Sequence, residues 1–291
     1  MDIALDIGGT KLAAAKVRRG EIVEQRTTPT PGDDPDALIR ALVELCDGWI
    51  SEARMISSAV TGVVRDGHVV AVNKAIISNW HGYPLQRRLA ACFGADKTYR
   101  FLNDAVAACW GEYLARQLRP PSMVYLTIST GVGGGMVIHG RPVIGANYKA
   151  GHFGHIQVAS TPLCGCGRRG CVEALASGRA ISEQASALLK RTVDAKWVFD
   201  ELERMPELMA IIDGSAKAIA RLLDGLDMIV DAGLVVIGGG VGLAPGYLDR
   251  VRKAIGADQT FAIEPALLGA DSGLVGAAKW VTASIDTDRS P

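Results

Sequence analysis

Three cysteines and one histidine are grouped in a short stretch of the sequence. Cys164, Cys166 and Cys171 lie within eight residues, and His155 precedes the first of them by nine residues. Three thiolates and one imidazole form a donor set that suits a tetrahedral Zn²⁺ ion, whereas Mg²⁺ does not select thiolates. Because four protein ligands leave no coordination position for water, we expect a structural zinc site.

A disulfide and a chance cluster are the alternatives to this zinc site. The N-terminal sequence MDIALDIGG has neither the basic region nor the cleavage motif of a secretion signal. We therefore expect a cytoplasmic protein, in which thiols stay reduced. Cys46, Cys92 and Cys109 are scattered in apolar helical patterns and are interpreted as small buried side chains.

Three glycine-rich turns are candidates for binding phosphate, because glycine lets phosphate oxygens approach backbone N–H groups closely. The first two lie between predicted strands, so neither is a P-loop or a dinucleotide-binding motif, in which the loop runs into a helix. Each alone is compatible with a simple hairpin turn. The turns are Gly8–Thr10, Thr130–Gly135 and Gly238–Gly240.

Two aspartates lie where predicted strands end. Asp6 could hold Mg²⁺ through water beside the phosphates, or it could cap the strand end. Lys11 could meet a phosphate or be solvated. Asp104 follows Asn103 at a strand-to-helix junction, where it could accept the proton of a hydroxyl group or act as a helix N-cap.

The elements that position these residues follow from hydrophobic periodicity and turn signals. The pattern of residues 5–23, strand, glycine turn, strand, turn and strand, returns at residues 126–144 after the break RPPS, which predicts two similar halves. The other expected elements are a helix over 36–53, a strand from 55 to 62, a helix over 84–94, a strand and helix over 98–118, helices over 177–226, a strand and helix start over 233–247, and a final helix over 271–284.

Composition narrows the classes of function. The chain has 291 residues, with 31 basic and 31 acidic ones. This balance gives no net field that would attract nucleic acid or an anionic membrane surface. No apolar run reaches the roughly 20 residues that span a bilayer.

The motifs LDIGGTK, LND, STGVGGG, GHFGH and CGCGRRGCVE occur in the order found in the ROK family, which the chain resembles over nearly its whole length. This family comprises sugar kinases and repressors of the actin-like ATPase superfamily. The resemblance implies an α/β, two-domain actin-like ATPase (ribonuclease H-like) fold with a cleft between the domains. The expected domains are 1–118, completed by the C-terminal helix at 274–291, and 119–273 with the zinc loop.

The resemblance also implies an ATP-dependent sugar kinase that uses ATP and Mg²⁺ and carries structural Zn²⁺, with Asp104 as the general base. It places ATP at Asp6, Gly8, Gly9, Thr10, Lys11, Thr130, Gly131, Val132, Gly133, Gly134, Gly238 and Gly239. It places the sugar at Gly62, Asn79, Asn103, Asp104, His152, His155 and Glu173, and zinc at His155, Cys164, Cys166 and Cys171.

His152 departs from the pattern of most kinases of this family, which have Glu-x-Gly-His at this place. A neutral imidazole accepts one hydrogen bond and donates one, whereas a carboxylate only accepts, so the sugar preference should move away from glucose. AGHFGH resembles the family members that phosphorylate N-acetylmannosamine at its 6-hydroxyl in sialic acid catabolism. His152 could instead be a bystander or a competing zinc ligand.

The alternatives to this substrate are those of a glucokinase, a fructokinase or an N-acetylglucosamine kinase. Repressors of the family carry a DNA-binding domain before the first glycine loop, and Asp6 lies too near the start for one. A sugar-binding protein without catalysis is disfavoured by the presence of both Asp6 and Asp104. The family is often dimeric, so we expect a homodimer that acts on a small sugar, with no nucleic-acid or membrane partner.

Overall fold

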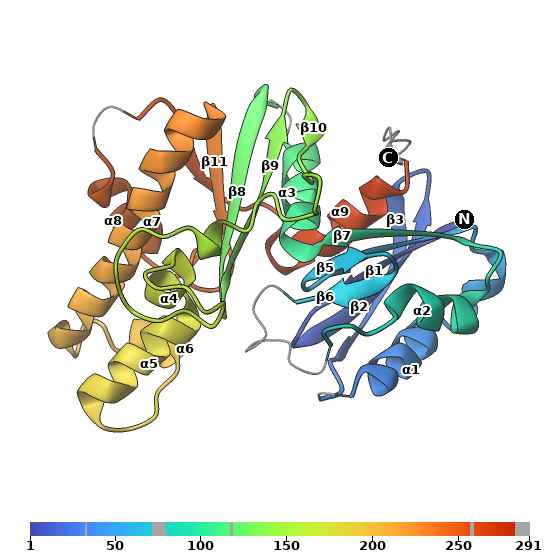
Figure 1. The fold of residues 1–291 in the computed structure, drawn as a ribbon, viewed down its shortest axis with the longest axis horizontal. Coiled ribbons are helices and arrows are strands. Elements are labelled where there is room, and N and C mark those ends of the chain that lie inside the picture. Colours follow the sequence, from blue (N-terminus) through green and yellow to red (C-terminus); the bar gives the residue numbers. More distant parts are fainter. Residues whose placement is uncertain (33, 72–79, 117–118, 257–258, 283–291) are drawn as a thin grey trace. The chain divides into compact units, whose positions relative to one another are not determined.

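The computed structural model describes all residues except 33, 72–79, 117–118, 257–258 and 283–291. Contacts divide the chain into two compact units, each with its own five-stranded sheet (Figure 1). Unit 1 comprises Met1–Val72, Ile77–Gly111 and Asp271–Pro291, and unit 2 comprises Asn73–Ile76 and Glu112–Ala270. The division into functional domains at residues 118/119 and 273/274 stays a prediction.

The sheet of unit 1 has the strand order β3-β2-β1-β4-β7. Its first three strands are antiparallel, as the two tight turns at the N-terminus predict, and β4 and β7 are parallel to β1 and β4. The strands are β1 (Asp2–Ile7), β2 (Lys11–Arg18), β3 (Glu21–Pro29), β4 (Met55–Val60) and β7 (Thr98–Asn103). A separate hairpin, which the sequence pattern did not predict, consists of β5 (Val63–Arg65) and β6 (His68–Val70).

The sheet of unit 2 repeats this layout in the order β10-β9-β8-β11-β12. The strands β8, β9 and β10 form antiparallel pairs. On the other side of β8, β11 pairs with β8 and β12 pairs with β11, both in parallel. The strands are β8 (Ser122–Ile128), β9 (Val132–Ile138), β10 (Arg141–Pro142), β11 (Leu234–Gly238) and β12 (Ala262–Pro265). The prediction of two similar halves is therefore confirmed.

Helices cover both faces of the sheet in unit 1. Ile3, Leu5 and Ile7 of β1 pack in one cluster with residues of α1 and α2, while α9 packs on β1 and β4. The helices are α1 (Pro35–Leu45), α2 (Leu85–Phe93), α3 (Asp104–Ala115, which enters unit 2), α9 (Ser272–Trp280), and the short 3₁₀ helices η1 (Ile50–Glu52) and η4 (Gly269–Asp271).

The helix expected over 36–53 was predicted too long. It ends at Leu45, and Gly48 has a φ of 77°, a left-handed conformation that favours glycine and interrupts the helix. The strand expected to end at Gly62 ends at Val60 for a similar reason, because Gly62 has a φ of 97°. Cys46 and Cys109 are buried as predicted, but Cys92 is exposed, so its interpretation as a core residue was wrong.

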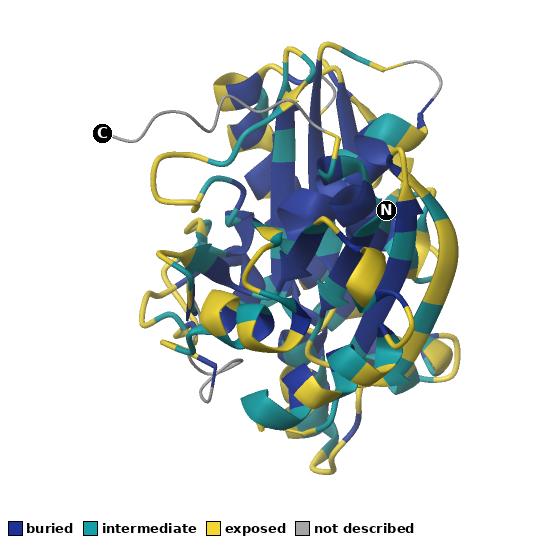
Figure 2. Cartoon of the chain, turned by 90° about the vertical axis from the view of Figure 1, so that its right-hand side faces the viewer, coloured by how far each residue is buried: buried dark blue, intermediate teal, exposed yellow. Residues whose placement is uncertain are grey.

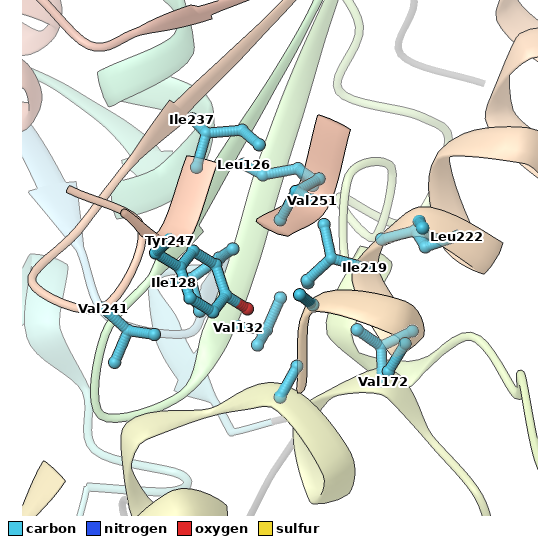
Figure 3. Packing of buried hydrophobic residues seen from close by; sticks show 14 of the residues in the cluster. Leu126, Ile128, Val132, Val172, Ile219, Leu222, Ile237, Val241, Tyr247 and Val251 are labelled. Carbon is cyan, nitrogen blue, oxygen red and sulfur yellow. The ribbon is translucent and has the colours of Figure 1, made fainter. Parts of the chain in front are cut away.

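The core of unit 2 lies between its sheet and a layer of helices. Figure 3 shows side chains of β8, β11, α7 and α8 in one apolar cluster. In both units the central strands and the inner helix faces are buried, and exposed residues lie on loops, outer helix faces and the edge strands β3 and β12 (Figure 2). The helices are η2 (Phe153–His155), α4 (Val172–Ala176), α5 (Gly178–Leu189), α6 (Ala195–Asp200), η3 (Pro206–Leu208), α7 (Met209–Val230) and α8 (Tyr247–Ala254).

Among the residues that the structure describes, no helix has both the length and the apolar character needed to cross a membrane.

Candidate active site and metal centre

Asn103, the last residue of β7, caps helix α3. Its side-chain oxygen accepts the backbone N–H groups of Ala105 at 3.1 Å and Val106 at 3.3 Å, the bonds expected of an N-cap. The capping of this helix therefore does not depend on the carboxylate of Asp104 alone. The alternative interpretation of Asp104 as a mere cap loses its main support.

The carboxylate of Asp104 is fixed by three donors. Its Oδ1 accepts the backbone N–H of Ala105 at 2.8 Å and the Asn103 side-chain amide at 2.9 Å, and its Oδ2 accepts the Thr61 hydroxyl at 3.0 Å. Burial raises the pKa of Asp104, and these hydrogen bonds partly offset the effect. A carboxylate whose pKa lies above its usual range is a better proton acceptor than an exposed aspartate.

Thr61 and Gly62 come from the end of β4, next to β7. The Asn103 amide nitrogen also donates to the Gly62 carbonyl at 2.9 Å, so both strand ends are tied to the same side chain. Sequence reasoning selected Gly62 and missed Thr61. Its only signal was its position directly before Gly62, at the end of a buried strand that runs parallel to β1.

Asp6 lies one residue before the end of β1. Its pKa is raised to about 7, first by burial and then by the negative charge of Asp104, while Lys11 lowers it and Asp271 raises it further. A Cβ atom placed on Gly273 of α9 would lie 3.0 Å from Asp6 Oδ2, so a glycine is needed here to leave room for the carboxylate. Asp6 and Asp104 thus form an electrostatically coupled pair of carboxylates within unit 1.

The first glycine turn is a tight connection between β1 and β2. The Gly8 N–H donates to the Lys11 carbonyl at 3.2 Å, and the Thr30 hydroxyl donates to the Gly8 carbonyl at 2.7 Å. Gly9 and Thr10 are exposed at the tip of the turn. Lys11 pairs with Asp271 at 3.5 Å, a contact between residues at opposite ends of the chain that sequence spacing could not indicate.

The second and third glycine turns meet at the end of β8 in unit 2. Residues 129–131 connect β8 to β9, and Gly133 and Gly134 lie within β9 itself. Gly239, with a φ of 84°, follows β11, and a Cβ on it would lie 2.4 Å from the Ile128 carbonyl. The structure therefore brings two of the predicted phosphate-binding turns together.

The four predicted zinc ligands converge in unit 2. One donor atom from each of His155, Cys164, Cys166 and Cys171 lies within 4.8 Å of the other three. The His155 Nδ1 is 3.7 Å from the Cys164 Sγ, and the Cys166 Sγ is 3.8 Å from the Cys171 Sγ. Zn–S bonds of about 2.3 Å in a tetrahedron place two sulfur atoms about 3.8 Å apart, so this donor set fits zinc.

His152 directly precedes the 3₁₀ helix η2, and His155 is the last residue of that helix. The His152 Nδ1 is 3.1 Å from the Lys149 carbonyl, which can only accept, so Nδ1 carries the proton and Nε2 is left as an acceptor. Burial lowers the pKa of His152. Burial also lowers the pKa of His155, while the carboxylate of Glu173 acts in the opposite direction.

Glu173 is buried on α4, two residues after the predicted ligand Cys171, and its Oε2 accepts the Val132 N–H at 3.1 Å. Among the predicted site residues, Asn79 lies outside the described residues. The structure brings the others into two groups. Unit 1 holds Asp6, Gly8, Gly9, Thr10, Lys11, Gly62, Asn103 and Asp104, and unit 2 holds the zinc ligands, His152, Glu173 and the glycines of the other two turns.

Comparison with known proteins agrees with this arrangement. The model of the ROK family matches residues 2–284. The chain is 38% identical to the N-acetylmannosamine kinase of Vibrio cholerae serotype O1 over 283 residues, which covers 95% of this chain and 97% of that protein.

Two solved structures of the same family are also similar. The ROK hexokinase of Thermus thermophilus has a TM-score of 0.82 and 32% identity, with 96% of both chains covered. A ROK family glucokinase of Streptomyces griseus, solved in complex with glucose and AMPPNP, has a TM-score of 0.79 and 28% identity, with 96% of this chain and 98% of that chain covered.

The chain belongs to the ROK family, and within it to the class of ATP-dependent sugar kinases. The predicted α/β fold of actin-like ATPases is confirmed by these structures and by the duplicated sheet.

Proposed function

We propose that this sugar kinase transfers the terminal phosphoryl group of ATP to the 6-hydroxyl of N-acetylmannosamine. The observation that carries the proposal is the hydrogen-bonded Asp104 carboxylate, held in place by Asn103 and Thr61 at the end of β7. The substrate is supported by the 38% identity to an N-acetylmannosamine kinase over 95% of the chain. It is also supported by His152, which stands where other members of the family carry a glutamate.

Asp104 is the general base of the proposed reaction. Its carboxylate accepts the proton of the sugar hydroxyl as the oxygen forms its bond to phosphorus. Both hydrogens of the Asn103 amide group are engaged, one by Gly62 and one by Asp104. Asn103 therefore orients the base, and a sugar hydroxyl that donates to its side-chain oxygen would share that oxygen with the N–H groups of Ala105 and Val106.

Asp6, Lys11 and the glycine turns are the nucleotide-binding groups of the proposal. Asp6 is partly accessible and, once ionised, is a carboxylate suited to Mg²⁺, the ion that neutralises charge on the transferred phosphoryl group when bound. Lys11 and the backbone N–H groups of the turns bind phosphate oxygens. The Lys11–Asp271 pair keeps the ammonium group close to the turn without burying it.

Zinc has a structural role in the proposal. His155 and the three cysteines would hold the ion with four protein ligands, so it would order the loop between His155 and α4 and take no part in the transfer. His152 presents its Nε2 as a hydrogen-bond acceptor, since Nδ1 is committed to Lys149. We base the proposed preference for N-acetylmannosamine over glucose on this single neutral acceptor, which replaces a carboxylate.

The compartment, the pathway and the oligomeric state of the enzyme are part of the same proposal. We place the enzyme in the cytoplasm, where free thiols such as those of the six cysteines stay reduced. We place it in the catabolism of sialic acid, which releases N-acetylmannosamine, and we expect a homodimer in solution. Size-exclusion chromatography with light scattering tests the dimer directly.

A coupled assay of ADP release tests the substrate. N-acetylmannosamine, glucose, fructose and N-acetylglucosamine are compared by kcat/KM, and ³¹P–¹H correlation spectroscopy of the product identifies the phosphorylated carbon. Preference for N-acetylmannosamine with phosphate at carbon 6 supports the proposal. Preference for glucose favours the second candidate, which the hexokinase and glucokinase relatives suggest, and no turnover with any sugar overturns both.

A further inference from the structure

The carboxylate of Glu173 links the zinc loop to a glycine turn. Glu173 lies in the first turn of α4, which begins directly after Cys171. Its side chain is 4% exposed, and Oε2 accepts the backbone N–H of Val132, the first residue of β9, at 3.1 Å. A side chain anchored two residues from a zinc ligand thus fixes the strand that leaves the Thr130–Gly131 turn.

The 3₁₀ helix η2, which precedes the zinc loop, contacts the other side of Val132. A Cβ placed on Gly154 of η2 would lie 2.1 Å from the Val132 carbonyl oxygen, so the backbone of η2 is in direct contact with that carbonyl. The side chains of Val132 and Val172 belong to one apolar cluster (Figure 3). Val132 is therefore held at its N–H, its carbonyl and its side chain by residues that flank the metal centre.

The position of Val132 determines the shape of the turn. Val132 pairs with Ile128 in the last register of the β8–β9 hairpin, so residues 129–131 connect two fixed points. The carbonyls of Ser129 and Thr130 accept the N–H groups of Gly178 at 2.7 Å and Arg179 at 3.3 Å, at the start of α5. With both carbonyls held there, the Glu173 bond fixes the backbone N–H at which the turn enters β9.

We propose that Glu173 is a positioning residue for the Thr130–Gly131 turn, through which the loop that holds the predicted zinc ligands supports nucleotide binding as well as the sugar site. This inference rests on the proposed function, because it takes the turn to bind phosphate. The physical reason is the cost of a buried N–H without an acceptor: if Glu173 is removed, the Val132 N–H must move to find another partner. The turn moves with it.

The test uses Glu173→Ala and Glu173→Gln in the full-length protein. Hydrogen exchange of peptides covering residues 129–135 reports on the turn, and calorimetry with MgADP in the absence of sugar reports on nucleotide binding. We expect Glu173→Ala to speed exchange and to raise the MgADP Kd by roughly three- to tenfold, the range of one lost hydrogen bond. Glu173→Gln keeps an oxygen acceptor and should restore both quantities to within about twofold.

Glu183→Ala is the matched control, because it removes an exposed carboxylate of α5 that only pairs with Arg179. It should leave exchange and MgADP binding unchanged. If both Glu173 variants weaken only sugar binding, Glu173 is a sugar contact alone and the inference is wrong. If Glu173→Ala does not fold, Glu173→Gln decides: a Gln variant with slow exchange and intact MgADP binding supports the inference, and one with fast exchange or weak binding contradicts it.

The failure of the proposed function is recognised separately. If the wild-type protein neither binds MgADP nor phosphorylates any sugar, the assignment of the turn to phosphate is wrong, whatever exchange shows. If the wild-type protein binds MgADP normally and Glu173→Ala binds it equally well, only the positioning role is overturned.

Discussion

At the scale of single residues, the coupling of two carboxylates distinguishes this site from ordinary strand ends. Asp104 is half-buried and bound by three donors, whereas Asp6 has a pKa of about 7 because of burial and the neighbouring Asp104 charge. Two interacting carboxylates titrate as a pair, and their environments give them different tasks. Each task predicts a different response to substitution and to pH.

Asp104→Asn should lower kcat by at least about 10²-fold, the usual contribution of a general base, with sugar binding and fold retained. The amide oxygen can still accept the N–H of Ala105, so the start of α3 should be undisturbed. In the wild-type enzyme, kcat should fall with decreasing pH at values above those typical of an exposed aspartate, because burial raises the pKa of Asp104. Steady-state kinetics measure both effects.

Asp194→Asn is the matched control, since Asp194 also caps a helix, accepting the Trp197 N–H at 2.7 Å. Its kcat should equal that of the wild type. An Asp104→Asn enzyme with full kcat would remove Asp104 from the mechanism.

Asp6→Asn should stabilise the ligand-free protein at neutral pH while it lowers activity. Folded Asp6 keeps its proton up to about pH 7, whereas the unfolded chain releases it near 3.8, so the folded state holds more protons between these values and its stability falls as pH rises. The Asp6→Asn variant does not show this loss of stability with rising pH, because its side chain carries no titratable proton. The gain should be at most about 4 kcal/mol at pH 8, from a shift of about three pKa units, and should vanish below pH 4.

Thermal unfolding without Mg²⁺ measures this gain as a rise in Tm of about 2–4 °C per kcal/mol. Asp2→Asn, in the same strand, is the matched control for exchanging a carboxylate for an amide. A Tm difference for Asp6→Asn that is the same at pH 4 and pH 8 would contradict the prediction.

His152→Glu should shift the ratio of kcat/KM toward glucose over N-acetylmannosamine by about tenfold, because the carboxylate restores a second acceptor. His139→Glu, which places the same charge on the exposed turn after β9, should leave the ratio unchanged. An unchanged ratio in both variants makes His152 a bystander. The coupled ADP-release assay measures all three enzymes.

At the scale of elements, the zinc loop shows how far short-range sequence information reaches. The ligand set was predicted from spacing alone, because the cysteines lie close in sequence and their glycines permit a tight fold: a Cβ on Gly170 would lie 1.7 Å from the Ala159 carbonyl. The Glu173–Val132 bond was not predicted, since it joins two elements whose proximity depends on the packing of α4 against β9. Likewise, nothing local indicated that Thr61 would reach Asp104 from the neighbouring strand.

Cys166→Ser should lose bound zinc and weaken sugar binding or stability, because hydroxyl is a much poorer zinc ligand than thiolate. Metal analysis of the purified protein and thermal unfolding measure the two effects. Cys92→Ser is the matched control, since Cys92 is an exposed free cysteine of α2. A wild-type protein purified without zinc would contradict the assignment of the site.

At the scale of the whole molecule, the duplicated sheet was predictable and the helix ends were not. The recurrence of strand, glycine turn, strand, turn and strand gives the antiparallel part of each sheet directly. The early end of α1 depends on the left-handed conformation of Gly48, which a periodicity of apolar residues does not reveal. The pairing of Lys11 with Asp271 requires the last helix to return to the first sheet, which only the family resemblance suggested.

Gly276→Ala should destabilise unit 1 by about 1–3 kcal/mol, because α9 packs on α3 with its backbone in contact. A Cβ on Gly276 would lie 1.8 Å from the Ala107 carbonyl oxygen. Gly225→Ala, at an open position of helix α7, should be neutral or slightly stabilising, since alanine is the better helix former. Thermal or denaturant unfolding compares the two, and equal stabilities would contradict the close packing of α9.

The return of helix α9 to unit 1 has a consequence for how the protein is made. Residues 112–270 emerge from the ribosome as one continuous piece and can complete their own core during translation. The amino-terminal sheet, although synthesised first, must wait for α9 before the face that this helix packs on is covered. Nascent chains stalled shortly before residue 271 should therefore hold a finished second half beside a first half that still recruits chaperones.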